Sequence, residues 1–83
     1  MNYRQMQIKN LQMVIDQFLP GDYEINHARM NHEGEDLEWF ELIKWTDISK
    51  KEHRCPMSSP TWSSFQDSVI SMCATEIELA KEY

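Results

Sequence analysis

Apolar side chains recur at helical spacing near both ends of this chain and alternate, as in a strand, between those ends. Within residues 2–19 one stripe follows the 3.6-residue period of a helix, formed by Ile8, Leu11, Val14, Ile15, Phe18 and Leu19. Residues 59–80 carry a second stripe, formed by Trp62, Phe65, Val69, Met72, Cys73, Ile77 and Ala80. Two helices that each bury one stripe, joined through strands, predict an α+β fold.

Residues at the ends of both stripes favour the start or the end of a helix. Asn2 and Gln5 have the spacing of a capping box, in which each side chain bonds to the backbone N–H of the other residue. Pro20 ends the first helix because proline cannot continue it. Ser59 is the expected N-cap of the second helix, with Pro60 at the first helical position, where a missing N–H costs little.

The region after the first helix begins with a strand pattern. In residues 23–30, Tyr23 and Ile25 alternate with polar residues, and the alternation then fades. This pattern predicts an edge strand with one wet face. Residues 31–36 predict a loop, in which Gly34 is free to adopt positive φ.

Residues 37–46 predict the partner strand of a hairpin. The segment is rich in aromatic residues, and its length matches that of the preceding strand. A strand here has two apolar faces, one with Trp39, Ile43 and Trp45 and the other with Phe40 and Leu42. The alternative is a helix that groups Leu37, Phe40, Ile43 and Lys44.

Residues 47–58 are polar, contain Pro56 and predict an irregular connection. The predicted order is therefore α-β-β-α, with two helices packed on one face of an antiparallel β-hairpin. A two-stranded sheet is marginal by itself. Unless residues 47–58 contain a third strand, we expect a homodimer contact or a partner protein to cover the second apolar face, which carries Phe40 and Leu42.

A length of 83 residues predicts a single domain, residues 1–83, with one small core. Hydrophobic residues make up 41% of the chain, too many for a disordered protein. No apolar run approaches the roughly 20 residues that span a bilayer. The first residues lack the apolar region of a secretory signal. We therefore expect no membrane contact and a cytoplasmic location.

The net charge of −6 is concentrated in one stretch, residues 22–41. Its only base is Arg29, and its acids are Asp22, Glu24, Glu33, Glu35, Asp36, Glu38 and Glu41. Acids and bases balance in the rest of the chain. Such a field attracts partners of opposite sign and repels nucleic acid and anionic lipid. Direct binding of DNA or RNA is therefore not expected.

The densest part of this stretch is the candidate partner-binding site. It comprises Glu33, Glu35, Asp36, Glu38, Trp39 and Glu41. One interpretation is a solvated loop that keeps a small protein soluble. The other is a negative surface that docks on a basic groove, where carboxylates stand in for phosphates and the aromatic residue supplies an apolar anchor.

The sequence offers little for catalysis or metal binding. Cys55 would need His53 as its base, and no oxyanion hole is evident. Two glycines in the whole chain exclude a glycine-rich phosphate loop. His27, His32 and the His53–Cys55 pair lack the tight spacing of a structural zinc site. We expect no catalytic residue, no metal and no cofactor, and we expect Cys55 and Cys73 to be free thiols.

Two smaller charged features have more than one interpretation. Glu76 lies within the second apolar stripe, either at its edge near a frayed helix end or paired with a buried Arg4. A basic cluster is either a wet loop, a phosphate contact or one half of a self-contact with the acidic stretch; it consists of Lys50, Lys51, His53 and Arg54.

These features lead to three functional hypotheses, and no family motif supports any of them. The first is a small, acidic, non-enzymatic inhibitor that occludes a basic, nucleic-acid-binding surface of a larger protein or nucleoprotein. Anti-CRISPR and anti-restriction proteins of phages and other mobile elements are similar in size and charge. The alternative is a homodimeric accessory or assembly subunit with no inhibitory role. The third is a small zinc- or thiol-dependent enzyme.

Overall fold

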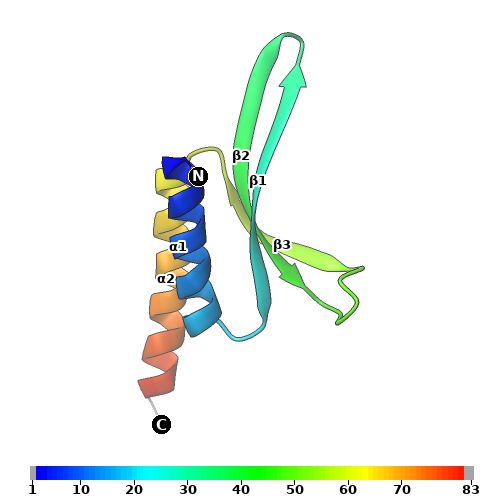
Figure 1. Ribbon diagram of the computed structural model, residues 1–83. Helices are drawn as coiled ribbons and strands as arrows, with labels where there is room; N and C mark the ends of the chain where they lie inside the picture. Colours follow the sequence, from blue (N-terminus) through cyan, green and yellow to red (C-terminus); the bar gives the residue numbers. More distant parts are fainter. Residues whose placement is uncertain (1, 82–83) are drawn as a thin grey trace.

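A computed structural model describes residues 2–81 of the chain and shows a three-stranded antiparallel sheet with two helices on one face (Figure 1). The elements are α1 (Tyr3–Phe18), β1 (Asp22–His32), β2 (Glu35–Trp45), β3 (His53–Ser59) and α2 (Trp62–Lys81). The helices run side by side in the same direction. The α+β prediction of two helices on an antiparallel hairpin is confirmed, and residues 37–46 are strand rather than helix over most of their length.

The irregular connection expected over residues 47–58 is wrong for its second half. β3 lies there and pairs antiparallel with β2, with a register shift between Leu42 and Lys44. Pro56 lies within this irregularity, because Cys55 and Pro56 of β3 stand against the single residue Ile43 of β2, and on an edge strand its missing N–H breaks no regular ladder bond. The polar composition of β3 reflects its exposed position, and this is why its sequence resembles a loop.

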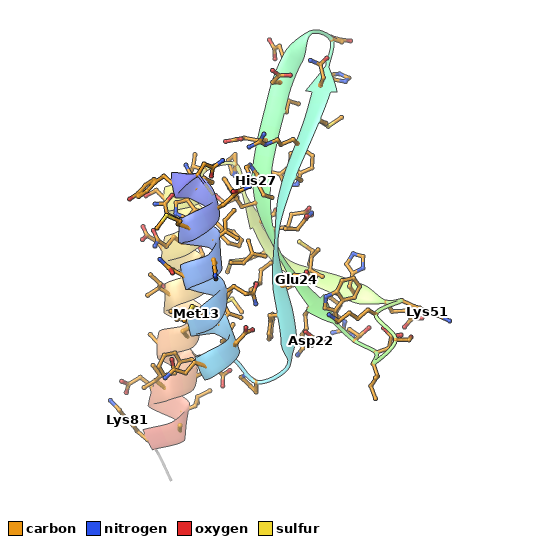
Figure 2. The ribbon with its side chains drawn as sticks, in the orientation of Figure 1. Met13, Asp22, Glu24, His27, Lys51 and Lys81 are labelled. Carbon is orange, nitrogen blue, oxygen red and sulfur yellow. The ribbon has the colours of Figure 1, made fainter. Side chains whose placement is uncertain are left out.

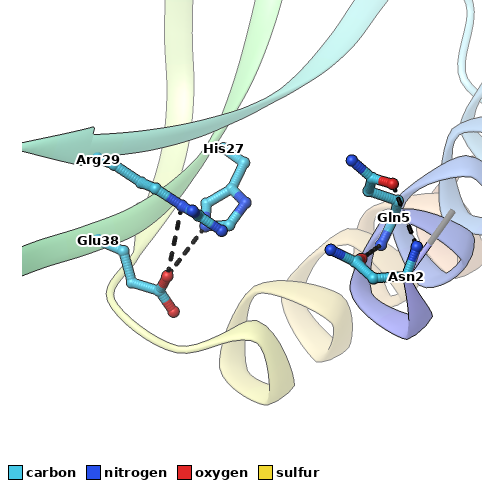
Figure 3. A network of polar contacts seen from close by, with 5 residues as sticks. All are labelled: Asn2, Gln5, His27, Arg29 and Glu38. Carbon is cyan, nitrogen blue, oxygen red and sulfur yellow. Dashed lines mark hydrogen bonds and ion pairs between the residues drawn. The ribbon is translucent and has the colours of Figure 1, made fainter.

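The start of α1 has the expected capping residues, whereas the start of α2 differs from the prediction. Asn2 and Gln5 form the capping box, with bonds of 2.8 Å from the Gln5 N–H and 3.2 Å from the Asn2 N–H (Figure 3). The second helix begins later than expected. Its N-cap is Thr61, whose hydroxyl accepts a bond from the N–H of Ser64. Ser59 belongs to β3 instead, and its hydroxyl accepts the N–H of Thr61.

Both helices pack on the sheet face that carries Phe40 and Leu42, the reverse of the expected assignment. The buried core consists of Leu11, Ile15, Leu19, Phe40, Leu42, Trp62, Phe65, Val69 and Cys73. The cross-strand register explains this choice. Ile25 pairs with Leu42 and adds apolar surface to this face, whereas the opposite face receives Glu24 and Asn26 from β1.

Not every residue of the two predicted stripes is buried. Phe18 is 39% exposed at the end of α1, and Ala80 is exposed near the end of α2. The last turns of α2 extend past the end of α1, so α1 does not cover the end of α2 (Figure 1). Glu76 is half-buried there and forms no ion pair with Arg4. The Arg4 guanidinium lies instead over the rings of Phe40 and Trp62, 5.4 and 5.3 Å from their centroids.

Candidate binding surface

β1 and β2 continue beyond the helices as a two-stranded projection, which we call the hairpin arm and define as residues 28–38 (Figure 1). Every residue from 29 to 38 is exposed. β3 pairs with β2 only from Phe40 onward, so the arm has no third strand. The acidic segment expected to meet a partner is therefore on the most protruding part of the described chain.

The tip of the arm is a two-residue turn rather than the longer loop expected over residues 31–36. Glu33 and Gly34 both have positive φ, 53° and 84°. This is the signature of a type I′ turn, whose twist matches that of the flanking strands. Both strands therefore continue up to the turn, and His32 pairs directly with Glu35.

On the face of the arm that continues the helix-covered side of the sheet, acids meet partners from β1. The Nε2 atom of His27 lies 3.1 Å from a carboxylate oxygen of Glu38, and the Nε atom of Arg29 lies 3.9 Å from the same oxygen (Figure 3). Asn31 donates a 2.9 Å hydrogen bond to Asp36. These contacts hold the acids in place, but exposed pairs of this kind contribute little to stability.

The other face of the sheet, which we call the open face, is covered by no helix in the described part of the chain. On the arm, Met30 pairs with Leu37, and at the base of the arm Ala28 pairs with Trp39. Met30 is 46% exposed, Leu37 is 42% exposed and Trp39 is half-buried. Together they form an apolar strip along the arm, with the side chain of Glu35 at its outer end.

The open face is more polar towards the base of the sheet. The indole Nε1 of Trp45 donates a 3.0 Å bond to Glu24, and Asn26 donates a 2.9 Å bond to Glu41. These cross-strand pairs engage carboxylates that would otherwise be free. On this face, within residues 2–81, Glu35 near the tip has no such bond, whereas Glu24 and Glu41 near the base do.

The structure does not bring all six predicted site residues to one face. Glu35, Trp39 and Glu41 share the open face, Asp36 and Glu38 lie on the opposite face, and Glu33 is in the turn. Consecutive strand residues point to opposite sides, so an acidic run along a strand surrounds it rather than forming a patch. Met30 and Leu37 were missed because only the pairing register brings them together.

The surroundings of Cys55 disfavour the thiolate form of its side chain. Partial desolvation of this otherwise exposed side chain, together with the nearby carboxylate of Glu41, raises the pKa of the Cys55 thiol above its ordinary value. The sulfur donates to the carbonyl of Met57 at 3.3 Å and lies 3.8 Å from Glu41. The ring of His53 packs edge-on against Trp45 instead, with centroids 5.3 Å apart. A nucleophilic cysteine needs a lowered pKa, so this arrangement does not favour a thiol enzyme.

Across residues 2–81, the structure shows no cluster of three or more His, Cys, Asp or Glu side chains able to hold a metal ion. In the same residues, no helix is long and apolar enough to cross a membrane. Comparisons with protein-family models, with curated proteins and with solved structures found no match. The candidate surface therefore rests on the geometry and charge of the hairpin arm.

Proposed function

We propose that this protein binds a basic surface of a larger protein or nucleoprotein through its hairpin arm, without catalysing a reaction. By occupying that surface, it keeps nucleic acid from binding there and acts as an inhibitor. The observation that carries the proposal is the coincidence of unburied acids and exposed apolar side chains on one protruding arm. Small acidic inhibitors from phages and other mobile elements are similar in size and charge.

Charge and apolar contact have separate parts in this proposal. The arm's only base is Arg29, and its acids are Glu33, Glu35, Asp36 and Glu38. A negative projection of this kind speeds the encounter with a basic partner. Met30 and Leu37 contribute nothing to the protein's own core, so they are available as the desolvated centre of an interface.

We place this activity in the cytoplasm. Cys55 is exposed on β3 and Cys73 is buried in the core, and both are free thiols in the structure. Free thiols are the usual state of cysteines in a reducing compartment, which supports the proposed location.

The test uses a charge-reversal variant of the arm, in which Glu35, Asp36 and Glu38 are all changed to Lys. Wild type and variant serve as baits in a lysate of the native host, and retained proteins are challenged with heparin as a polyanion. We expect the wild type to retain a basic protein that heparin releases. We expect the variant to lose it, because the three lysines reverse the negative charge of the arm that attracts the basic protein. Retention should also fall with added salt.

The matched control reverses three exposed acids outside the arm, Glu52, Asp67 and Glu78, which changes the net charge by the same amount. This control should retain the partner as wild type does. Equal loss in both variants would show that only total charge matters. Equal retention in both would contradict the proposal and leave the acids as a solubility feature.

The open face favours a second candidate function, that of a homodimeric accessory subunit. Trp39, Ile43 and Trp45 are only half-buried there, without a covering layer in the described chain. Sedimentation equilibrium over a concentration series distinguishes the two candidates. A dimer that Ile43→Lys dissociates, with no basic partner retained, would favour this second function.

A further inference from the structure

β1 forms one edge of the sheet, so one side of its backbone faces away from β2. The two-residue turn makes His32 and Glu35 the first directly hydrogen-bonded pair of the hairpin. Such pairs recur at every second residue of an antiparallel ladder. The even-numbered residues of β1 therefore bond to β2, and the odd-numbered residues direct their N–H and C=O groups outward.

The contacts of Gln12 on α1 independently confirm that the odd-numbered residues of β1 direct their backbone groups outward. Its side-chain amide donates a 2.8 Å bond to the carbonyl of Tyr23 and accepts a 3.0 Å bond from the N–H of Ile25. A single side chain thus satisfies the edge as a neighbouring strand would. Another strand therefore cannot pair with the part of the β1 edge nearest the helices.

Beyond Ile25 the edge is open. Within residues 2–81, the outward N–H and C=O groups of His27, Arg29 and Asn31 meet no side chain or main chain of the protein. His27 is half-buried, and the other two residues are exposed. Proline, charged side chains or a covering loop commonly protect an edge strand; residues 27–31 contain no proline, no loop of the described chain covers them, and Arg29 is their one charged side chain. An edge in this state is a template for another strand.

We infer that residues 27–31 of β1 take up an extended basic segment of the partner as a further strand of the sheet. The inference rests on the proposed function of the arm and adds its mode of binding. Charge selects the occupant, because the acids of the arm outnumber Arg29. A second copy of this chain would place two negative arms side by side, and like charges across a ladder are destabilising.

The neighbours of the open edge specify the character of this segment. Side chains of the added strand that point to the open face lie beside Ala28 and Met30, so apolar residues fit there. Those on the other face lie beside His27, Arg29 and Asn31 of β1, with Asp36 and Glu38 one strand further on β2. Because these two acids outnumber Arg29, basic residues fit on this face beside His27 and Asn31. The partner segment therefore alternates basic and apolar residues.

The probe is a peptide of alternating lysine and valine, titrated into the isotope-labelled full chain and followed by nuclear magnetic resonance. We expect saturating peptide to slow hydrogen exchange at the amides of His27, Arg29 and Asn31.

Arg29→Pro should weaken binding at least about tenfold, because it removes an outward N–H and blocks the incoming strand. The β1–β2 pairing should survive because the N–H of residue 29 points away from β2. Arg29→Gln is the matched control, since it removes the same charge but keeps the N–H, and it should bind the peptide at least as tightly as wild type does.

Three results would overturn strand addition: no binding of the peptide, binding without slower exchange at these amides, or equal binding by the proline and glutamine variants. If Arg29→Pro does not fold, the exchange measurement on the unaltered chain decides. The arm charge-reversal variant separates this inference from the proposed function. If it loses the peptide while Arg29→Pro retains it, electrostatic docking stands and strand addition fails. The opposite result would uphold strand addition and contradict the electrostatic proposal.

Discussion

Phe40 is the residue that joins the core to the base of the hairpin arm. Its buried ring stacks on His27 at a centroid distance of 4.5 Å and meets the edge of Trp62 at 5.3 Å. The Arg4 guanidinium lies over the rings of Phe40 and Trp62. Among the described residues, the Nη1 atom of Arg4 and the Nε1 atom of Trp62 are buried without an acceptor. The cation–π contacts partly offset the cost of burying this guanidinium.

Single substitutions in the core should be costly. Leu11 is 4% exposed and Phe65 is fully buried, so Leu11→Ala and Phe65→Ala each remove packed apolar volume. We expect each to lower the free energy of unfolding by about 2–5 kcal/mol. Met13→Ala on α1 is the control, because Met13 is 62% exposed. Urea denaturation followed by tryptophan fluorescence measures all three, and midpoints equal to wild type for the core variants would contradict the assigned core.

At the scale of elements, the loop between β2 and β3 is organised by one carboxylate. Asp47 accepts 2.9 Å bonds from the backbone N–H groups of Lys51 and Glu52 and a bond from the Ser49 hydroxyl. These bonds, that of Ser49 first, lower the pKa of Asp47 below its ordinary value. Lys50 has positive φ, 58°, in the tight path that results. Lys50 and Lys51 of the predicted basic cluster are therefore held in this exposed loop, and His53 and Arg54 follow at the start of β3, away from the acidic tip.

The lowered pKa of Asp47 predicts how the loop responds to pH. A carboxylate whose pKa is lowered in the folded state contributes its full stabilisation of that state at pH values above its unfolded pKa of about 3.9. That contribution is lost as the pH falls through the lower folded value. We expect hydrogen exchange at the amides of Lys51 and Glu52 to speed up relative to the core in that acidic range, and Asp47→Ala to have the same effect at neutral pH. Asp67→Ala on α2 is the control, and unchanged exchange in Asp47→Ala would contradict the role of Asp47.

For the molecule as a whole, the arm and the core are separable. The described residues extend over 53 × 29 × 22 Å, and the arm contributes no residue to the buried core. Figure 2 shows the side chains of the arm spread outward beyond His27, where no helix lies beside the two strands. Binding and folding should therefore respond to different substitutions.

Shortening the hairpin tests this separation. Ala28 and Trp39 occupy the same kind of paired position as His32 and Glu35, so an Asn-Gly turn can replace residues 29–38. We expect the free energy of unfolding to change by no more than about 1 kcal/mol, because only exposed contacts are lost. Binding of the basic partner or of the lysine–valine peptide should be abolished. A shortened protein that unfolds, or that still binds, would contradict the division between arm and core.

Local rules predicted much of the fold. The sequence contains the signals for the capping box at Asn2 and Gln5, for the end of α1 before Pro20 and for the strand character of residues 37–46, because each depends on neighbouring residues. β3 and the N-cap at Thr61 were missed because a polar edge strand and a polar loop have the same composition. The short turn at Glu33 and Gly34 was missed for a similar reason, since a charged segment next to a glycine does not reveal how far pairing continues.

The sequence by itself determined the fold class, the two helices, the central hairpin and the concentration of negative charge in residues 22–41. Each depends on periodicity or composition within one segment. Only the tertiary structure decided which sheet face the helices cover, because that depends on the register between Ile25 and Leu42. The same register divided the acids between two faces and brought Met30 beside Leu37. The contact of Gln12 with β1, which leaves the rest of the edge open, joins segments whose approach no local pattern specifies.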